Sequence, residues 1–195
     1  MAREDAARPE FWEKRFREGF TPWDAGKAPA SLERFLQHEP RGQRALIPGC
    51  GSGYEVRAFA EASFEVTAID FTPAAVERAQ QVLGPLAGRV RLADFFEFDP
   101  GDPFDLVYER AFLCALPRRI WPRYAPRAAD LLRPGGRLAG FFYFESGERG
   151  PPFGLKPGEL ETLLEPGFSR VDDSAVADSI PVFAGRERWQ VWTKR

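Results

Sequence analysis

The chain is poor in the residues that most metal sites and nucleophilic hydrolases need. His38 is the single histidine among the 195 residues, and Cys50 and Cys114 are the two cysteines. This scarcity argues against a histidine-rich zinc site, a metalloprotease with two histidines on one helix, and a hydrolase built on a Ser–His or Cys–His pair. Two cysteines are also too few for a disulfide framework or a four-cysteine metal site. The sequence therefore predicts no metal centre.

The chain also lacks an excess of charge of either sign and any long apolar run. Its 27 lysines and arginines against 29 aspartates and glutamates give a net charge of −2, which disfavours a nucleic-acid clamp. The longest stretch without a charged side chain, residues 45–54, is far below the ~18 apolar residues that span a bilayer. Residues 1–19 contain no apolar core of a signal peptide. We therefore expect a cytoplasmic protein without nucleic-acid or membrane partners.

What the chain does contain is a globular composition and an alternation of strand-like and helix-like segments. Hydrophobic residues make up 44% of the chain and charged residues 29%, and its length is typical of a single domain, residues 1–195. Short apolar runs alternating with helical stretches predict βαβ units and a mostly parallel sheet. The expected strands are 44–48, 64–71, 90–96, 104–108 and 137–144. The expected helices are 55–62, 73–83 and 117–132, although Pro122 and Pro126 argue against helix in the first half of the last.

The two ends of the chain depart from this alternation. A short helix at 156–164 precedes two strand-like runs, 168–175 and 186–194, with no helix-length segment between them. Strands joined by a loop pair antiparallel, because a parallel return needs a crossover of a dozen or more residues. The sequence therefore predicts five parallel strands finished by an antiparallel pair at one edge. Residues 1–40, rich in aromatic and charged side chains, are expected to form a lid or flank over a core of residues 41–195.

A glycine-rich turn, PGCGSGY at 48–54, follows the first expected strand and leads directly into a helix. Gly49 and Gly51 allow the backbone to turn sharply and to approach a ligand where a Cβ would clash. Asp70 ends the second expected strand, where its carboxylate can accept both hydroxyls of a ribose. Asp94 ends the third and is followed by Phe95, a pairing suited to an adenine amino group and ring. These residues predict an adenosine site, against the alternative that the glycines form only a tight turn.

The spacing of the glycines distinguishes between adenosine cofactors. A dinucleotide fingerprint requires G-x-G-x-x-G, but the third position is Tyr54 counted from Gly49 and Val56 counted from Gly51. The pattern G-x-G-x-G, with acidic residues ending the second and third strands, fits S-adenosylmethionine better. A nicotinamide-dependent oxidoreductase is therefore disfavoured.

Longer motifs extend over nearly the whole chain. They read FWEKRFREGFTPWDAGK at 11–27, ALIPGCGSGY at 45–54, AIDFTPAAVERA at 68–79, DFFEF at 94–98, FDLVYERAFLCAL at 104–116, LLRPGGRL at 131–138, GPPF at 150–153 and EPGF at 165–168. In this order they resemble the thiopurine S-methyltransferase superfamily, in particular its halide/thiol ("harmless to ozone layer") branch and bacterial relatives. The resemblance implies a Rossmann-like class I methyltransferase, a three-layer α/β sandwich with a seven-stranded, mostly parallel sheet.

The resemblance also implies roles for individual residues. Aromatic residues of the N-terminal motif close over S-adenosylmethionine, since aromatic faces attract a sulfonium cation. Arg110 matches an arginine of the thiopurine branch, where halide/thiol enzymes carry tyrosine, and is the implied catalytic residue because it could attract an anion or lower a bound thiol's pKa. Arg110 could instead hold Asp24 or Glu109 in an ion pair. The implied cofactor contacts are Trp12, Phe16, Trp23, Gly49, Gly51, Asp70, Asp94, Phe95 and Arg110.

The reaction expected from these residues is methyl transfer to a small, soft nucleophile. Thiols, bisulfide, selenide and halides are the candidate acceptors, with thiols first because of Arg110. A thiolate or a halide arrives as an anion, so we expect no general base to be needed, mainly alignment and exclusion of water. Two alternatives remain: a sensor that binds S-adenosylmethionine without turnover, and an O- or N-methyltransferase of a small metabolite, whose base would be Tyr108, Glu109, Tyr143 or Glu145. The resemblance further implies a monomer or weak dimer.

Overall fold

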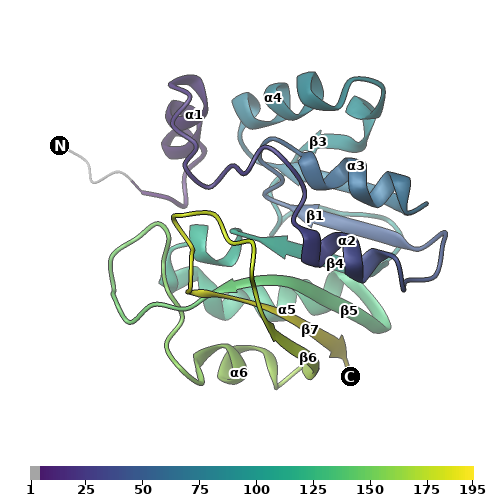
Figure 1. Cartoon of the computed structure of the whole chain (residues 1–195), viewed down its shortest axis with the longest axis vertical. Helices are drawn as coiled ribbons and strands as arrows, with labels where there is room; N and C mark the ends of the chain where they lie inside the picture. Colours follow the sequence, from purple (N-terminus) through teal and green to yellow (C-terminus); the bar gives the residue numbers. More distant parts are fainter. Residues whose placement is uncertain (1–4) are drawn as a thin grey trace.

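A computed structural model describes residues 5–195, whose seven strands form a sheet in the order β3-β2-β1-β4-β5-β7-β6 (Figure 1). The strands are β1 (Arg44–Pro48), β2 (Glu65–Asp70), β3 (Val90–Leu92), β4 (Phe104–Arg110), β5 (Leu132–Tyr143), β6 (Phe168–Ala175) and β7 (Glu187–Lys194). Strands β1 to β5 pair in parallel, whereas β7 runs antiparallel to both β5 and β6. The predicted parallel sheet with an antiparallel pair at one edge is confirmed.

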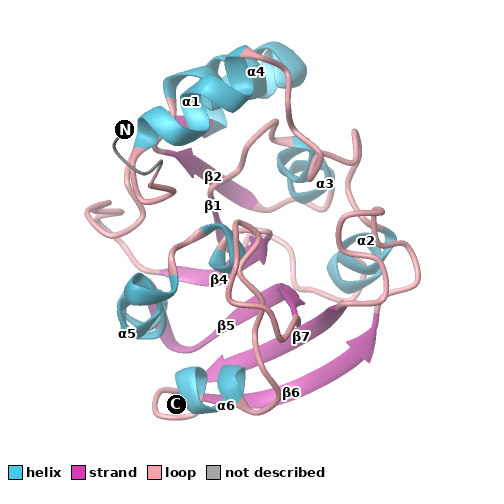
Figure 2. Ribbon diagram, turned by 90° about the vertical axis from the view of Figure 1, so that its left-hand side faces the viewer, coloured by secondary structure: helices cyan, strands magenta, loops and turns pink. Residues whose placement is uncertain are grey.

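Helices cover both faces of the sheet (Figure 2). One face packs against α2 (Ala30–Leu36), α3 (Tyr54–Glu61) and α4 (Pro73–Leu83), and the other against α5 (Trp121–Leu131) and α6 (Glu159–Leu164). Along β1, Ala45 and Ile47 join the first apolar cluster and Leu46 the second, because successive side chains of a strand point to opposite faces. Within residues 5–195, no helix combines the length and apolar character needed to cross a membrane.

Two strands differ most in length from the prediction. β3 ends at Leu92 rather than at residue 96, so Asp94 and Phe95 lie in a turn beyond the strand and not at its end. Within that turn, the N–H groups of Glu97 and Phe98 donate to the Asp94 carbonyl, which takes the backbone out of the sheet. β5 begins at Leu132 rather than at residue 137, and its first residues include Gly135 at a φ of 73° and an irregular register against β4.

The third predicted helix is shorter but includes both prolines. A 3-10 turn at Arg118–Ile120 precedes α5, in which Pro122 occupies the first turn and Pro126 lies inside the helix. Proline is tolerated in the first turn because the N–H that it lacks has no partner there. Buried Trp121 and Tyr124 anchor this helix to the sheet, so apolar burial outweighs the hydrogen bond lost at Pro126.

The described part of the N-terminal segment, residues 5–40, contains two helices with different surroundings. Helix α1 (Pro9–Arg17) lies beside α4, to which Arg17 is bound by an ion pair with Glu77. The Glu13 carboxylate accepts the N–H of Ala74, in the first turn of α4, at 2.8 Å. Helix α2 instead buries Leu32 and Leu36 in the core.

Candidate active site

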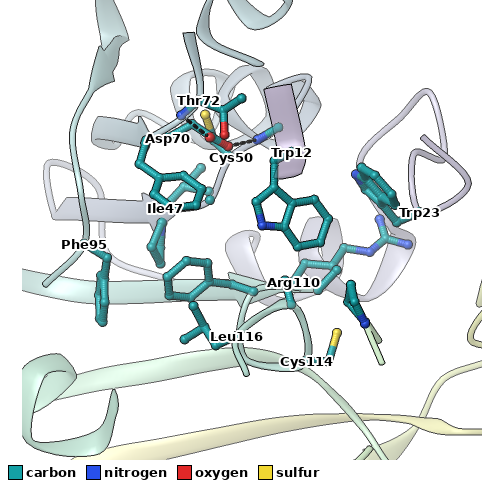
Figure 3. Close-up of a pocket in the computed structure, with 18 of the residues that line it drawn as sticks. Trp12, Trp23, Ile47, Cys50, Asp70, Thr72, Phe95, Arg110, Cys114 and Leu116 are labelled. Carbon is teal, nitrogen blue, oxygen red and sulfur yellow. Dashed lines mark hydrogen bonds between the residues drawn. The ribbon is translucent and has the colours of Figure 1, made fainter. Parts of the chain in front are cut away.

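A cavity of about 550 Å³ lies between the carboxyl ends of the parallel strands and the N-terminal segment (Figure 3). The structure brings all nine residues implied by the resemblance to the wall of this cavity: Trp12, Phe16, Trp23, Gly49, Gly51, Asp70, Asp94, Phe95 and Arg110. In Figure 3, Asp70 and Phe95 lie at one side of the cavity and Trp23, Arg110 and Cys114 at the other. We call these sides the adenosine end and the acceptor end.

The glycine turn brings backbone directly against the cavity. Gly49 has a φ of 59° and Gly51 a φ of 52°, left-handed conformations that side-chain-bearing residues rarely adopt. A Cβ on Gly49 would lie 2.4 Å from Cδ2 of Phe112, so this close approach requires glycine. Phe112, which belongs to the motif FDLVYERAFLCAL, is contributed by the loop after β4.

Asp70 is buried at the end of β2 and is held by backbone donors. Its Oδ1 accepts the N–H of Thr72 at 2.9 Å, and its Oδ2 accepts the N–H of Gly51 at 3.1 Å. Burial raises the pKa of Asp70, while these backbone N–H groups oppose the rise. Because each carboxylate oxygen carries a second lone pair, Asp70 can still accept hydroxyl groups. The geometry therefore fits a ribose at the adenosine end.

Asp94 and Phe95 complete this end from the turn after β3. The Asp94 Oδ1 accepts the N–H of Phe96 at 2.7 Å, and the residue is otherwise exposed. Phe95 is buried, with its ring centroid 5.1 Å from that of Phe112. The turn thus presents a carboxylate and an aromatic ring side by side, an arrangement that suits an adenine edge and face.

Three aromatic side chains of the N-terminal segment form the outer wall. The ring of Trp23 lies edge-on to Trp12 at 5.4 Å and to Phe16 at 6.0 Å between centroids. The Trp12 indole N–H donates to the carbonyl of Ala6 at 2.8 Å, which fixes the plane of its ring. A bound sulfonium within about 6 Å of these rings would be stabilised by cation–π attraction.

Arg110 ends β4 at the acceptor end, and its ion-pair partner differs from both residues considered from sequence. Its Nη1 lies 3.6 Å from Oε1 of Glu55 on α3, and its guanidinium lies 5.2 Å from the Phe141 ring centroid. Asp24 instead accepts the hydroxyl of Ser52 at 2.5 Å. The Nε of Arg110 is buried without a hydrogen-bond partner among the described residues.

The four residues considered as bases have other surroundings. The Glu109 carboxylate accepts the N–H groups of Phe112 and Leu113, and burial raises its pKa to about 8. Tyr108 is among the residues that line the cavity, but burial raises the pKa of its hydroxyl well above the ordinary value. Burial also raises the pKa of Tyr143, and Glu145 forms an ion pair with Arg186 at 2.7 Å.

Sequence reasoning missed several residues of the cavity wall. Glu55 lies in the first turn of α3, directly after the glycine turn, and a signal was available, because a carboxylate there faces the carboxyl end of β4. Phe183 comes from a loop far along the chain, and nothing local in sequence indicates its position, whereas Pro151 and Pro152 belong to the GPPF motif at 150–153.

Comparison with known proteins shows that this chain is similar to methyltransferases. The family model described as thiopurine S-methyltransferase (TPMT) matches residues 7–195. The probable thiol methyltransferase 2 of Arabidopsis thaliana is 34% identical over 193 residues, covering 94% of this chain and 84% of that protein. Thiocyanate methyltransferase 1 of Brassica oleracea is 33% identical, with coverage of 94% and 84%.

A solved structure agrees with the fold. The 1,6-didemethyltoxoflavin-N1-methyltransferase of Burkholderia thailandensis, solved with bound S-adenosylhomocysteine, superposes with a TM-score of 0.74. Its sequence is 24% identical, and the match covers 95% of this chain and 86% of that one. At this identity the likeness supports the fold, the Rossmann-like α/β sandwich of class I methyltransferases.

Proposed function

This chain belongs to the thiopurine S-methyltransferase family, and from that membership we propose that it methylates small thiols bound beside Arg110. It is an S-adenosylmethionine-dependent methyltransferase whose acceptors are small, soft nucleophiles. The preference for thiols among these acceptors rests on one observation, the buried guanidinium of Arg110 in the cavity wall. A cation at this position favours a thiolate over the neutral thiol.

The cavity fits S-adenosylmethionine at its other end, and we propose that the predicted residues hold it there. Gly51 supports this, because its φ of 52° exposes its backbone to the cavity, and a Cβ there would contact Cζ of Phe16 at 3.6 Å. Asp70 would accept the ribose hydroxyls, and Asp94 with Phe95 would hold the adenine. Bound S-adenosylmethionine supplies an electrophilic methyl group. The chain's own residues align the acceptor with that group and exclude water.

Headspace gas chromatography tests the acceptor class. The protein is incubated with S-adenosylmethionine and, separately, with methanethiol, bisulfide and iodide. We expect dimethyl sulfide from methanethiol at a higher rate than methyl iodide from iodide. Faster turnover of iodide would place the protein with halide acceptors and contradict the preference for thiols. Cofactor binding without any methylated product from a broader thiol panel would favour the sensor.

We also propose that the protein acts as a monomer or weak dimer in the cytoplasm, without nucleic-acid partners. The near-balanced charge supports the last point, because a nucleic-acid site needs a cationic face. Size-exclusion chromatography with light scattering at several concentrations tests the oligomeric state, and a stable higher oligomer would contradict it.

A further inference from the structure

Glu55 and Arg110 form an ion pair in the wall of the cavity, at the acceptor end. Both residues line the cavity, and their side chains are only 14% and 9% exposed. The Nη1–Oε1 distance of 3.6 Å is longer than a hydrogen bond. The pair is therefore an electrostatic contact that a small group entering the cavity can replace.

Charged and titratable groups surround Glu55 on several elements. Arg110 and Tyr108 face it from β4, Cys50 from the glycine turn and Asp24 from the N-terminal segment. Burial raises the pKa of Glu55, the positive charge of Arg110 opposes this rise, and Asp24 adds to it. Glu187 on β7 interacts electrostatically with Arg110. A buried carboxylate in such a site holds a proton more readily than an exposed one.

Three other carboxylates of the cavity already accept hydrogen bonds from donors of their own. Asp24 accepts the Ser52 hydroxyl and the Gly26 N–H, and Asp94 accepts the Phe96 N–H. Asp70 is held by two backbone N–H groups at the adenosine end. Glu55 differs from these because its partner is the guanidinium that is itself placed to bind an anion.

We propose that Glu55 is the base that takes the proton of a thiol acceptor, while Arg110 holds the resulting thiolate. This inference rests on the proposed function. The acceptor S–H bond breaks, its proton goes to a carboxylate oxygen of Glu55, and the electron pair stays on sulfur. That sulfur then bonds to the methyl carbon as the carbon–sulfonium bond breaks, giving a thioether and S-adenosylhomocysteine. Glu55 returns its proton to solvent before the next turnover.

The charge of the site is unchanged during the proton transfer. Before it, the counter-ion of Arg110 is the Glu55 carboxylate, and afterwards it is the thiolate beside a neutral Glu55. No additional net charge is buried, so the transfer avoids the large cost of desolvating an unpaired ion. An acceptor that arrives as an anion has no proton to give and does not need Glu55.

Two thiols of similar size test this assignment. Phenylmethanethiol is protonated at neutral pH, whereas 4-nitrothiophenol is a thiolate. For Glu55→Gln we expect kcat/KM with phenylmethanethiol to fall by about 100-fold or more, a typical loss when a general base is removed. The rate with 4-nitrothiophenol should stay the same or rise, because a competing carboxylate has been removed from Arg110. Formation of S-adenosylhomocysteine, followed by mass spectrometry, is the readout.

Glu61→Gln, an exposed position at the end of the same helix, is the matched control and should leave both rates unchanged. Equal slowing of both thiols by Glu55→Gln, or no slowing of either, would overturn the proposal while leaving the thiol methyltransferase activity in place. A wild-type protein that turns over neither thiol would instead contradict the proposed function.

If Glu55→Gln does not fold, the pH profile of the wild-type protein and the variant Glu55→Asp still test the proposal. For phenylmethanethiol, kcat/KM should show an acid limb from protonation of Glu55, and 4-nitrothiophenol should lack that limb. Glu55→Asp should retain part of the activity with phenylmethanethiol. Identical acid limbs for both thiols would overturn the proposal.

Discussion

The two ends of the cavity are built in different ways. At the adenosine end, Asp70 and Asp94 bond backbone N–H groups of neighbouring turns, so their side chains are oriented before a ligand arrives. At the acceptor end, the Tyr108 hydroxyl and Arg110 Nε are buried without hydrogen-bond partners in the described chain, and at the adenosine end the Thr72 hydroxyl is also without one. Each such group costs roughly 1–3 kcal/mol, which a polar ligand or water can offset. The carboxylates of the adenosine end are thus oriented by the fold itself, whereas the Arg110 guanidinium keeps a buried N–H for a group that binds.

Asp70→Ala is expected to have the largest effect, because it removes the buried carboxylate of the adenosine end. Loss of two charge-assisted hydrogen bonds to ribose, at about 1.5 kcal/mol or more each, should weaken S-adenosylmethionine binding by about 100-fold or more. Isothermal titration calorimetry measures the Kd, with exposed Asp130→Ala on α5 as the matched control. Wild-type affinity in Asp70→Ala would show that the adenosine end has been assigned to the wrong residue.

Arg110→Ala tests the acceptor end. We expect kcat with a thiol to fall by about 10- to 100-fold, the effect of losing one charged hydrogen bond, with a smaller change in cofactor Kd than in Asp70→Ala. Steady-state kinetics and calorimetry on the same preparation provide the comparison, and Arg57→Ala, exposed on α3, is the control. If cofactor affinity fell as far as in Asp70→Ala, Arg110 would belong to the adenosine end.

Trp12→Leu examines the wall between the two ends. Cation–π attraction of about 0.5–2 kcal/mol should be lost, so S-adenosylmethionine binds roughly 2- to 30-fold more weakly. S-adenosylhomocysteine has no sulfonium charge and serves as the internal control, because its affinity should fall less. Calorimetry with both ligands gives the ratio, and an equal loss for both would point to packing instead of charge.

Glu109→Gln leaves both ends of the cavity in place and concerns stability instead of binding. The folded protein holds the Glu109 proton up to about pH 8, whereas the unfolded chain releases it near the ordinary value of 4.5. The free energy of unfolding therefore decreases as pH rises between these values, by at most about 1.4 kcal/mol per pH unit.

Glutamine keeps an acceptor for the Phe112 and Leu113 N–H groups but cannot ionise. In Glu109→Gln the free energy of unfolding should therefore decrease less steeply with rising pH. Urea unfolding at about pH 5.5 and pH 7.5 measures the slope. Glu165→Gln, at an exposed position, should leave it unchanged. An unaltered slope in Glu109→Gln would show that this carboxyl group does not titrate in the window.

The sequence predicted which residues lie together at the adenosine end of the cavity, because their placement is determined locally. A strand, a glycine turn and a helix follow one another within residues 44–61, and Asp70 occupies the same place after the next strand. The close approach of Gly49 and Phe112 joins the turn after β1 and the loop after β4. This approach therefore depends on the order of strands in the sheet. For the same reason, the Glu55–Arg110 pair could not be read from either motif alone.

The contact between α1 and α4 limits which parts of this enzyme can be exchanged with those of a relative. Thr72, the residue before α4, makes no side-chain capping bond, and the carboxylate of Glu13 reaches across from α1 to the N–H of Ala74. A residue outside the sheet thus supplies the cap of a helix that starts three residues after Asp70. The N-terminal segment and the Rossmann-like core are therefore not independent modules. A chimera that exchanges the segment to change acceptor preference would have to carry Glu13 with it.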